Sequence, residues 1–477
     1  MSAISGIYRS SINEVHKQMA NKLNHRGKGH FYWRNESATI SLAGNTSSHS
    51  GFFTDGDMVL AVDGKIQNYS ADDYLYPADI AALFNAKGEA FLQDLQGSFA
   101  LLLADDNDNL LAARDNHGIK PLYWGRYKES LCFASEAKAL SGLCQNIEAF
   151  PPGHCYYKGK LYRFHKLPQK PSPVETLDLP STAEQIKDIL FDAVAIHCNG
   201  AANMGVFLSG GLDSSILAAL SCRQDTEVHT FTVGFSQSQD QFYAREVADY
   251  LGTHHHEYIS DLTEIYEILP SVIYHLESFD VSLVRSAVAN YLASQQAAES
   301  GVDIILMGEG ADELFGGYNY LKNKNPVEQS LELNKLLAES HSMSLQRVDR
   351  MTSAYGLDVG LPFMDSRLIK LAEQIPINYK ITADKTEKWI LRTAFTGDLP
   401  ENIIWRPKVE FSQGSGTADV LSQSIQSRIS DSEFAAQKKI SDKLILNSKE
   451  ELYYYRIFHQ YFPERELAEN TCRWQPW

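Results

Sequence analysis

The sequence contains no apolar run long enough to cross a membrane, and it carries few positive charges for its size. No uninterrupted apolar stretch reaches about eighteen residues, and no basic segment leads into an apolar core at the N-terminus. Lys and Arg number 43 against 60 Asp and Glu, so the formal net charge is −17. This balance disfavours nucleic acids and anionic membrane surfaces as partners. We therefore expect a cytoplasmic protein that acts on small molecules, with no nucleic acid and no membrane as partner.

Cysteine is also scarce. The few cysteines form no C-x-x-C pair and show no metal-ligand spacing. They are Cys132, Cys144, Cys155, Cys198, Cys222 and Cys472. Scattered cysteines of this kind indicate buried thiols in a reducing compartment and argue against a disulfide framework.

The first third of the chain is rich in short predicted strands. With 477 residues, 44% of them hydrophobic, the chain is a soluble globular protein long enough for two or three domains. Alternating or apolar runs, separated by Gly, Asp and Asn turns, lie at 38–42, 58–62, 98–103, 110–113 and 130–134. A single helical pattern lies near 79–85. We expect a β-rich domain over residues 1–165.

A Pro-rich segment at 166–173 follows this domain. It shows neither helical nor strand periodicity, which is typical of an interdomain linker. We place the linker at 166–180 and a second domain at 181–477.

The second domain begins with strands that alternate with helices. Ser181 and Thr182, with Glu184, predict the capped start of a helix that runs to about His197. Apolar strand patterns follow at 205–208, 228–235, 255–259 and 303–307. Alternation of this kind predicts a parallel sheet built from βαβ units. From Val327 onward the pattern is mostly helical.

The stretch S-G-G-L-D-S-S at 209–215 joins a predicted strand to a predicted helix. Its adjacent glycines allow backbone N–H groups to approach a ligand closely, and its three serine hydroxyls and the helix N-terminus add donors for an anion. Asp213 beside phosphate implies a Mg²⁺ ion between them. The Walker pattern is absent. The loop resembles the pyrophosphate loop of ATP-pyrophosphatases, which cleave ATP to AMP and pyrophosphate while adenylating a substrate.

Further motifs continue this resemblance along nearly the whole chain. Those of the second half are F-T-V-G-F at 231–235, G-E-G-A-D-E-L-F-G-G-Y at 308–318, V-D-R-M-T-S-A-Y-G-L at 348–357, L-P-F-M-D at 361–365 and W-R-P-K at 405–408. Those of the first half are L-Q-G-S-F-A at 95–100, A-R-D-N-H-G-I-K-P-L-Y at 113–123, F-A-S-E-A-K-A-L at 133–140 and F-P-P-G-H at 150–154. The chain resembles the glutamine-dependent asparagine synthetases and, more distantly, β-lactam synthetase. The resemblance implies an α/β protein with an N-terminal Ntn-hydrolase-like αββα sandwich and a C-terminal ATP-pyrophosphatase-like parallel domain.

The resemblance also implies roles for individual residues. Glu309 matches a glutamate that accepts a proton from ammonia during attack on an acyl-adenylate. Lys408 and Lys388 match lysines that neutralise developing pyrophosphate charge, and Asp213 and Asp312 would share Mg²⁺. The residues expected to bind ATP are Leu208, Ser209, Gly210, Gly211, Asp213, Ser214, Ser215, Val233, Gly234 and Gly308. The downstream glutamate of β-lactam synthetase falls near Gln346, so its catalytic dyad is absent.

The glutaminase half departs from the family at its chemistry. The family's N-terminal cysteine nucleophile is here Ser2, whose hydroxyl needs stronger activation than a thiol. Lys65 stands where the family has a glutamate that binds the glutamine amine, which reverses the charge. The stretch 39–42 lacks the arginine that would hold the glutamine carboxylate. We therefore expect a structural domain without glutaminase activity.

The synthetase half departs from the family near the acyl substrate. A family arginine is here Gly360, and a family glutamate is Asp358. The segment Q-G-S-G-T at 413–417 resembles the form in β-lactam synthetase more than that in asparagine synthetase. These departures leave open an acyl pocket that differs from one for aspartate.

Together these features predict an ATP-dependent carbon–nitrogen ligase with ATP and Mg²⁺ as cofactors. It would adenylate a small-molecule carboxylate and join it to ammonia or to a substrate amine, in the second case as in β-lactam synthetase, without hydrolysing glutamine. One alternative is an asparagine synthetase that depends on ammonia. Another is a non-catalytic ATP-binding subunit, which the joint retention of Asp213, Asp312, Glu309 and Lys408 disfavours. A homodimer is left open.

Overall fold

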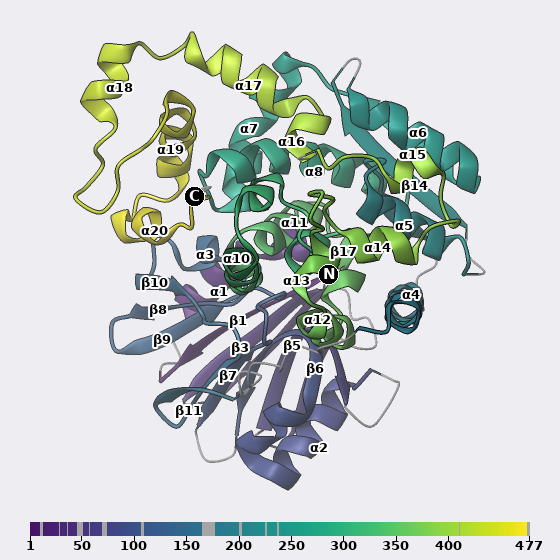
Figure 1. Cartoon of the computed structure of the whole chain (residues 1–477). Helices are drawn as coiled ribbons and strands as arrows, with labels where there is room; N and C mark the ends of the chain where they lie inside the picture. The colour runs from purple at the N-terminus through teal and green to yellow at the C-terminus, as the bar shows by residue number, and fades with distance from the viewer. Residues whose placement is uncertain are drawn as a thin grey trace.

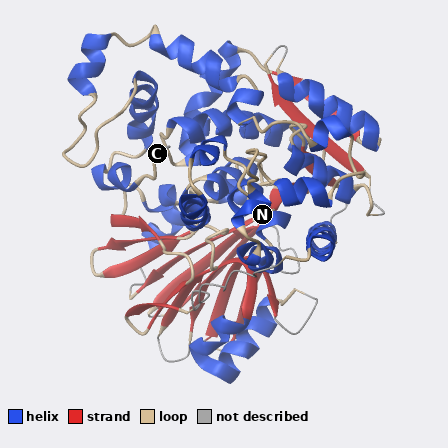
Figure 2. Ribbon diagram, in the orientation of Figure 1, coloured by secondary structure: helices blue, strands red, loops and turns tan. Residues whose placement is uncertain are grey.

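The computed structural model describes residues 1–474 except 10–12, 28, 36, 45–50, 57, 69–73, 106–108, 165–176, 200–202, 225–226, 236–237 and 410. The described chain forms two domains, one rich in strands and one rich in helices (Figures 1 and 2). The expected linker lies largely within 165–176, outside the described residues.

The N-terminal domain is a sandwich of two antiparallel sheets. In spatial order the first contains β10 (Gln145–Ala149), β8 (Tyr123–Tyr127), β9 (Ser130–Ala134), β1 (Ser2–Tyr8), β3 (Ala38–Gly44) and β2 (Gly29–Arg34). The second contains β12 (Lys160–Arg163), β11 (His154–Tyr157), β7 (Leu110–Arg114), β6 (Leu95–Ala104), β5 (Met58–Asn68) and β4 (Gly51–Asp55). Apolar side chains such as Ile4, Ile40, Val59, Leu102 and Phe133 fill the space between the sheets.

Helices cover the outer faces of this sandwich. The helices α1 (Asn13–Asn21) and α3 (Ala137–Leu140) contact the first sheet, and α2 (Pro77–Lys87) contacts the second (Figure 1). The αββα prediction is therefore confirmed. The five predicted strands and the predicted helix all occur, but several strands were missed. One of them is β1, all of whose residues are buried, so that it lacks the alternation that marks a half-exposed strand.

The C-terminal domain is built on a five-stranded parallel sheet. Its order is β15 (His254–Ile259), β14 (Val228–Gly234), β13 (Met204–Phe207), β16 (Ile304–Leu306) and β17 (Asp358–Gly360). The sheet is flanked by α4 (Leu179–Cys198), α5 (Leu212–Ser221), α6 (Gln239–Leu251), α7 (Leu262–Leu276) and α8 (Val281–Glu299). The predicted parallel sheet is confirmed, and β17 is a further strand that its three residues were too few to reveal.

The first helix of this domain starts earlier than expected. It begins at Leu179, with Pro180 in its first turn, and the Asp178 side chain accepts a hydrogen bond from the Ser181 N–H at 3.5 Å. The predicted cap at Ser181 and Thr182 is therefore wrong, because Asp178 takes the N-cap position and proline is well tolerated just after it.

The remainder of the chain is helical, as expected. These helices are α9 (Ala311–Phe315), α10 (Pro326–Glu339), α11 (Ser344–Ser353), α12 (Ser366–Gln374), α13 (Ile377–Lys380), α14 (Trp389–Ala394), α15 (Glu401–Ile404), α16 (Phe411–Gly414), α17 (Thr417–Gln426), α18 (Asp431–Gln437), α19 (Lys449–Tyr461) and α20 (Arg465–Asn470). None of the helices in the described part of the chain combines the length and apolar composition that a membrane crossing requires. All the cysteines are free thiols; Cys222 and Cys472 are partly exposed, and the others are buried as expected.

A buried network of charges joins the two domains. Arg26 and Glu136 of the N-terminal domain pair with each other at 2.5 Å, and Arg26 also pairs with Asp349 of α11. Next to Asp349, the Arg350 guanidinium lies 3.0 Å from Glu277. All five side chains are almost fully buried. Removing one member would leave an uncompensated charge in the interface.

Candidate active site

The loop between β13 and α5 approaches its surroundings too closely for any residue but glycine at one position. Gly210 has φ +65°, and a Cβ there would overlap Tyr243 and the backbone of Ala244. The loop is fixed by its own serines: the Ser209 N–H donates to Ser214 Oγ at 3.2 Å, and Ser215 Oγ donates to the Gly211 carbonyl at 2.8 Å. The helix N-terminus that follows is preorganised for an anion.

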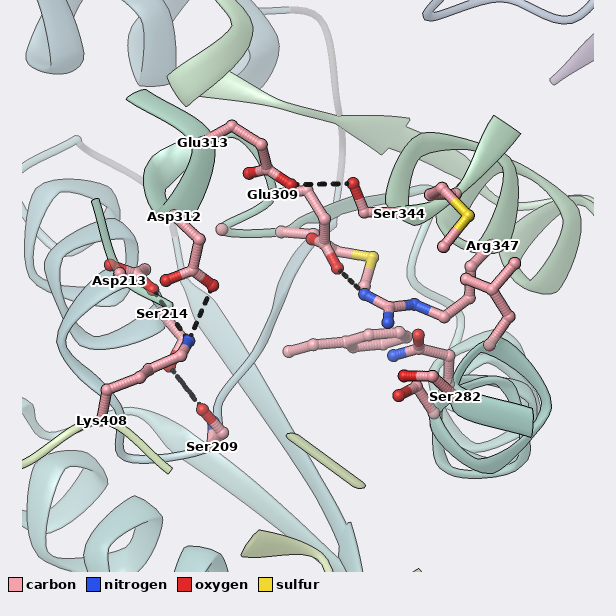
Figure 3. Close-up of a pocket in the computed structure, with 18 of the residues that line it drawn as sticks. Ser209, Asp213, Ser214, Ser282, Glu309, Asp312, Glu313, Ser344, Arg347 and Lys408 are labelled. Carbon is pink, nitrogen blue, oxygen red and sulfur yellow. Dashed lines mark hydrogen bonds and ion pairs between the residues drawn. The ribbon is translucent and has the colours of Figure 1, made fainter. Parts of the chain in front are cut away.

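Two aspartates and two lysines converge beside this loop. Figure 3 shows the two aspartates with one of the lysines, Lys408. Asp213 lies in the first turn of α5 and Asp312 in the first turn of α9, so both follow the carboxyl ends of neighbouring parallel strands. Lys388 Nζ lies 2.6 Å from Asp213 Oδ2 and 2.5 Å from Asp312 Oδ1. Lys408 Nζ lies 2.9 Å from Asp312 Oδ2 and 3.6 Å from Asp213 Oδ2.

The ion pairs shift the pKa values of Asp312 and Lys408. Burial alone would raise the pKa of Asp312, but the ammonium groups of Lys388 and Lys408 outweigh it and keep that pKa below its ordinary value. Burial would likewise lower the pKa of Lys408, yet Asp312 and then Asp213 raise it above the ordinary range. Asp213 Oδ1 is buried and has no hydrogen bond within the described structure. Two ionised carboxylates with an open oxygen suit Mg²⁺, which usually takes one or two protein carboxylates together with substrate phosphates.

Lys388 is held in place by the backbone. It adopts a left-handed conformation, with φ 54°, at the start of α14, and its side chain is 1% exposed. A Cβ at Gly317 would overlap both Lys388 Cε and Asp312, so glycine is needed there to admit the ion pair. Non-glycine residues with positive φ are uncommon, and they cluster at functional sites.

Glu309 lies in the turn after β16 and points into the same pocket as Asp312 (Figure 3). Its Oε1 accepts a hydrogen bond from Arg347 Nη2 of α11 at 2.6 Å. Nearby, Glu313 accepts hydrogen bonds from Tyr318 Oη at 2.8 Å and Ser344 Oγ at 3.2 Å. Burial, and then the Asp312 charge, raise the pKa of Glu313.

The structure brings most of the expected site residues together. A pocket of about 210 Å³ is lined by Leu208, Ser209, Asp213, Ser214, Val233, Gly308, Glu309, Asp312 and Lys408. A neighbouring pocket of about 50 Å³ is lined by Ser209, Gly211, Asp213, Lys388 and Lys408. Gly210, Ser215 and Gly234 line neither pocket and contribute to the shape of the loop and of β14.

Sequence reasoning missed two arginines of this site. Arg347 follows Gln346, whose side chain turns away and donates to the Leu276 carbonyl at 2.8 Å. Arg406 donates to the Ser209 carbonyl at 3.1 Å and to Asp240 at 2.8 Å. The W-R-P-K motif contains Arg406 and could have indicated it, whereas Arg347 carries no local signal.

Two of the departures expected near the acyl substrate lie elsewhere. Asp358 and Gly360 belong to β17 and do not line the pocket that holds Glu309. A Cβ at Gly360 would meet Leu306 and His197, and Asp358 lies 2.9 Å from the Met1 amino nitrogen of the N-terminal domain. Gly360 therefore lies beside β16 and α4, and Asp358 lies at the domain boundary.

Ser2, which stands at the position of the family's nucleophile, is engaged in a hydrogen bond. Ser2 Oγ donates to Asp63 Oδ1 at 2.7 Å, and both side chains are fully buried. Lys120 Nζ lies 3.7 Å and Arg26 Nη1 3.9 Å from the same carboxylate. Lys65 lies on the same strand as Asp63.

The family description "Asparagine synthase" matches residues 185–340 and 328–477, and "Glutamine amidotransferase domain" matches residues 37–142. The chain belongs to the asparagine synthetase family. Members of this family are ATP-dependent carbon–nitrogen ligases. The parallel sheet and its ligand loops thus form the synthetase domain, and the sandwich is the amidotransferase domain.

Similar proteins include two glutamine-hydrolysing asparagine synthetases. A probable enzyme of this name from Dictyostelium discoideum is 33% identical, over 99% of this chain and 90% of its own length. Asparagine synthetase 2 from Arabidopsis thaliana is 36% identical over 81% of this chain and 70% of its own. Among solved structures, glutamine PRPP amidotransferase from B. subtilis superposes with a TM-score of 0.30 at 12% identity, over 54% of this chain and 81% of that chain.

Proposed function

We propose that this chain is an AMP-forming amide synthetase that adenylates a small carboxylate and joins it to ammonia or to a substrate amine, without hydrolysing glutamine. The convergence of Asp213, Asp312, Lys388 and Lys408 in front of a phosphate-type loop, with Glu309 in the same pocket, carries this proposal.

ATP would lie across the carboxyl ends of β13 and β14. Leu208 and Val233 line the pocket at those ends and would contact adenosine, while the 209–215 loop would receive the phosphates. Asp213 and Asp312 would hold Mg²⁺, which when bound offsets phosphate charge.

In the first step, a carboxylate oxygen of the substrate attacks the α-phosphorus of ATP, and pyrophosphate leaves. Lys388 and Lys408 supply two positive charges beside the place where the leaving group gains negative charge. Lys388 is fixed by its strained backbone and by Gly317, so little reorganisation is needed during this step.

In the second step, a nitrogen lone pair attacks the acyl carbon and AMP departs. The attacking nitrogen becomes cationic and must lose a proton, for which Glu309 is the acceptor. The hydrogen bond from Arg347 fixes the Glu309 carboxylate inside the pocket.

The hydrogen bond between Ser2 and Asp63 supports the absence of glutamine hydrolysis. A serine hydroxyl that donates to a carboxylate is a weak nucleophile unless that carboxylate takes its proton. Lys120 and Arg26 lie 3.7 and 3.9 Å from the Asp63 carboxylate, and Lys65 places a further cation on the strand that would receive the glutamine amine. An incoming ammonium group would meet like charge there.

One second candidate has support of its own. The relatives are named asparagine synthetases and match over most of the chain, which favours aspartate as the acyl substrate and ammonia as the nitrogen source. A screen of pyrophosphate release from ATP with aspartate and other carboxylates, each with ammonium, tests both candidates. Release with aspartate supports the second, release with a different carboxylate the first, and none with any carboxylate contradicts both.

A further inference from the structure

A large cavity lies between the two domains and adjoins the synthetase pocket, with which it shares Glu313 in its lining. It measures about 1460 Å³ and is bounded by β5 and β6 on one side and by α10, α11 and α12 on the other. In Figure 1, α12 lies directly over β5 and β6, and Ser366 of α12 donates to Gln96 of β6 at 2.5 Å. The cavity is thus built by residues of both domains.

Two lysines of the N-terminal domain line this cavity. Lys120 is 7% exposed, and Lys65 is half-buried. Lys120 Nζ lies 3.7 Å from Asp63, whereas the Lys65 ammonium forms no ion pair with any carboxylate of the described chain and lies 5.5 Å from the Tyr74 ring centre. Burial lowers the pKa of Lys65, and Lys120 lowers it further, although Asp358 opposes both effects.

The carboxylates around these lysines are already engaged. Asp63 accepts the Ser2 hydroxyl, Asp349 pairs with Arg26 and Arg350, and Asp358 lies against the Met1 amino nitrogen. An ammonium that has no ion pair among the described residues is costly in a partly dehydrated cavity, and an anion that entered would offset this cost.

The wall beyond the lysines is apolar. Leu345, Leu361 and Ile369 are buried and face the cavity, and Leu337 of α10 is partly buried beside them. A ligand that reached from the lysines along this wall would bury apolar surface as well as place a negative charge. Inorganic phosphate could use only the charge, because it has no apolar surface to bury.

We propose that this interdomain cavity binds a small carboxylate with an apolar chain, with its carboxylate at Lys65 and Lys120 and its chain against Leu337, Leu345 and Ile369. These five residues do not line the pocket that holds Glu309, and the proposal does not depend on the proposed reaction. The region around Lys65, where the family binds glutamine, would then form the polar end of this ligand site.

Isothermal titration of the full chain with octanoate tests the proposal, with acetate and inorganic phosphate as chainless probes. Lys65→Met should weaken octanoate binding by about tenfold or more, because it removes the unpaired charge but keeps the side-chain length. Leu337→Trp should weaken octanoate binding and leave acetate binding unchanged, since it fills the apolar end. The matched control, Lys160→Met at an exposed lysine of β12, should bind as wild type does.

A second control separates this cavity from the acyl pocket. Asp312→Asn alters only the synthetase site and should bind octanoate normally. Lys65→Arg keeps the charge and should still bind octanoate. If Lys65→Met does not fold, the effect of Leu337→Trp on octanoate binding decides the proposal. Absence of octanoate binding to the wild type, equal affinity in Lys65→Met or Leu337→Trp, loss of binding in Asp312→Asn, or acetate and phosphate as tight as octanoate would each overturn the proposal.

Discussion

The two domains each carry a cluster of lysine and aspartate side chains, partly buried in the synthetase domain, but the clusters are arranged differently. In the synthetase domain, Lys388 contacts Asp213 and Asp312 at 2.6 and 2.5 Å, at the mouth of a phosphate-type loop. In the amidotransferase domain, Lys120 lies 3.7 Å from Asp63, whose oxygen is occupied by a serine hydroxyl. The first arrangement leaves ligand positions between its charges, whereas the second ties the expected nucleophile to a carboxylate.

The interface between the domains indicates why the amidotransferase domain would be kept even without glutaminase activity. Arg26 and Glu136 of the amidotransferase domain are buried against Asp349, Arg350 and Glu277 of the synthetase domain. Deleting the N-terminal sandwich would leave the buried charges of the synthetase domain without Arg26 and Glu136 as partners. The N-terminal domain therefore contributes to the stability of the synthetase domain whether or not it hydrolyses glutamine.

The largest expected effect is the loss of adenylation in Asp312→Asn. Removal of one carboxylate leaves two lysines with a single counter-charge and takes away a ligand for Mg²⁺. The loss of such a metal ligand typically raises the free energy of the transition state by several kcal/mol. Pyrophosphate release should fall by about a thousandfold or more. Asp303→Asn, at an exposed aspartate before β16, should release pyrophosphate as wild type does. Normal pyrophosphate release by Asp312→Asn would contradict the functional difference between the two clusters.

Glu309→Gln should separate the two half-reactions of the synthetase pocket. Adenylation uses the loop and the lysines, so AMP and pyrophosphate should still form, while the amide product should fall by about 10²–10⁴-fold because the proton acceptor is gone. Both products are measured in one assay. A parallel decline of both would mean that Glu309 only braces the loop, and an unchanged amide yield would exclude it from the reaction.

Arg350→Met tests the interface between the clusters. The change leaves Glu277 buried with less compensation, so the free energy of unfolding should fall by about 3–5 kcal/mol. Urea unfolding followed by circular dichroism measures it. Arg367→Met at a partly exposed ion pair with Asp365 is the matched control and should change stability by less than about 1 kcal/mol. Equal effects of the two variants would show that the interface network does not bind the domains together.

The smallest expected effect is a difference in acid sensitivity. Because the two lysines lower the pKa of Asp312 in the fold, its ion pairs stabilise the protein above the ordinary aspartate pKa of 3.8 and lose that contribution as the pH falls through the lowered value. Wild-type stability should therefore decline below pH 3.8 more steeply than that of Asp312→Asn. Thermal unfolding over a pH series measures both slopes, and identical slopes would contradict the ion-pair assignment.

Local patterns made much of the synthetase site predictable. The run 209–215, the acidic motif at 308–318 and W-R-P-K at 405–408 are each contiguous, and each lies where the fold places a ligand loop. Strands exposed on one face were visible by alternation, whereas the fully buried β1 and the three-residue β17 were not.

Contacts between distant segments were not predictable. The pairing of Glu309 with Arg347 joins residues 38 positions apart through a helix whose rotation no local pattern sets. Ser2 and Asp63 meet only because β1 and β5 lie on facing sheets. The family resemblance placed Asp358 and Gly360 near the acyl substrate; in the structure both belong to β17, and Asp358 lies against the Met1 amino nitrogen of the N-terminal domain.

One measurement tests the contrast between the two domains directly. The purified chain is incubated with ATP, Mg²⁺, glutamine, ammonium and the carboxylate that supports the highest rate, and pyrophosphate and glutamate are quantified in the same sample. We expect pyrophosphate to accumulate while glutamate stays at the level found without protein. Glutamate formed at a rate comparable to that of pyrophosphate would show that Ser2 is an active nucleophile and that the N-terminal domain has kept its chemistry.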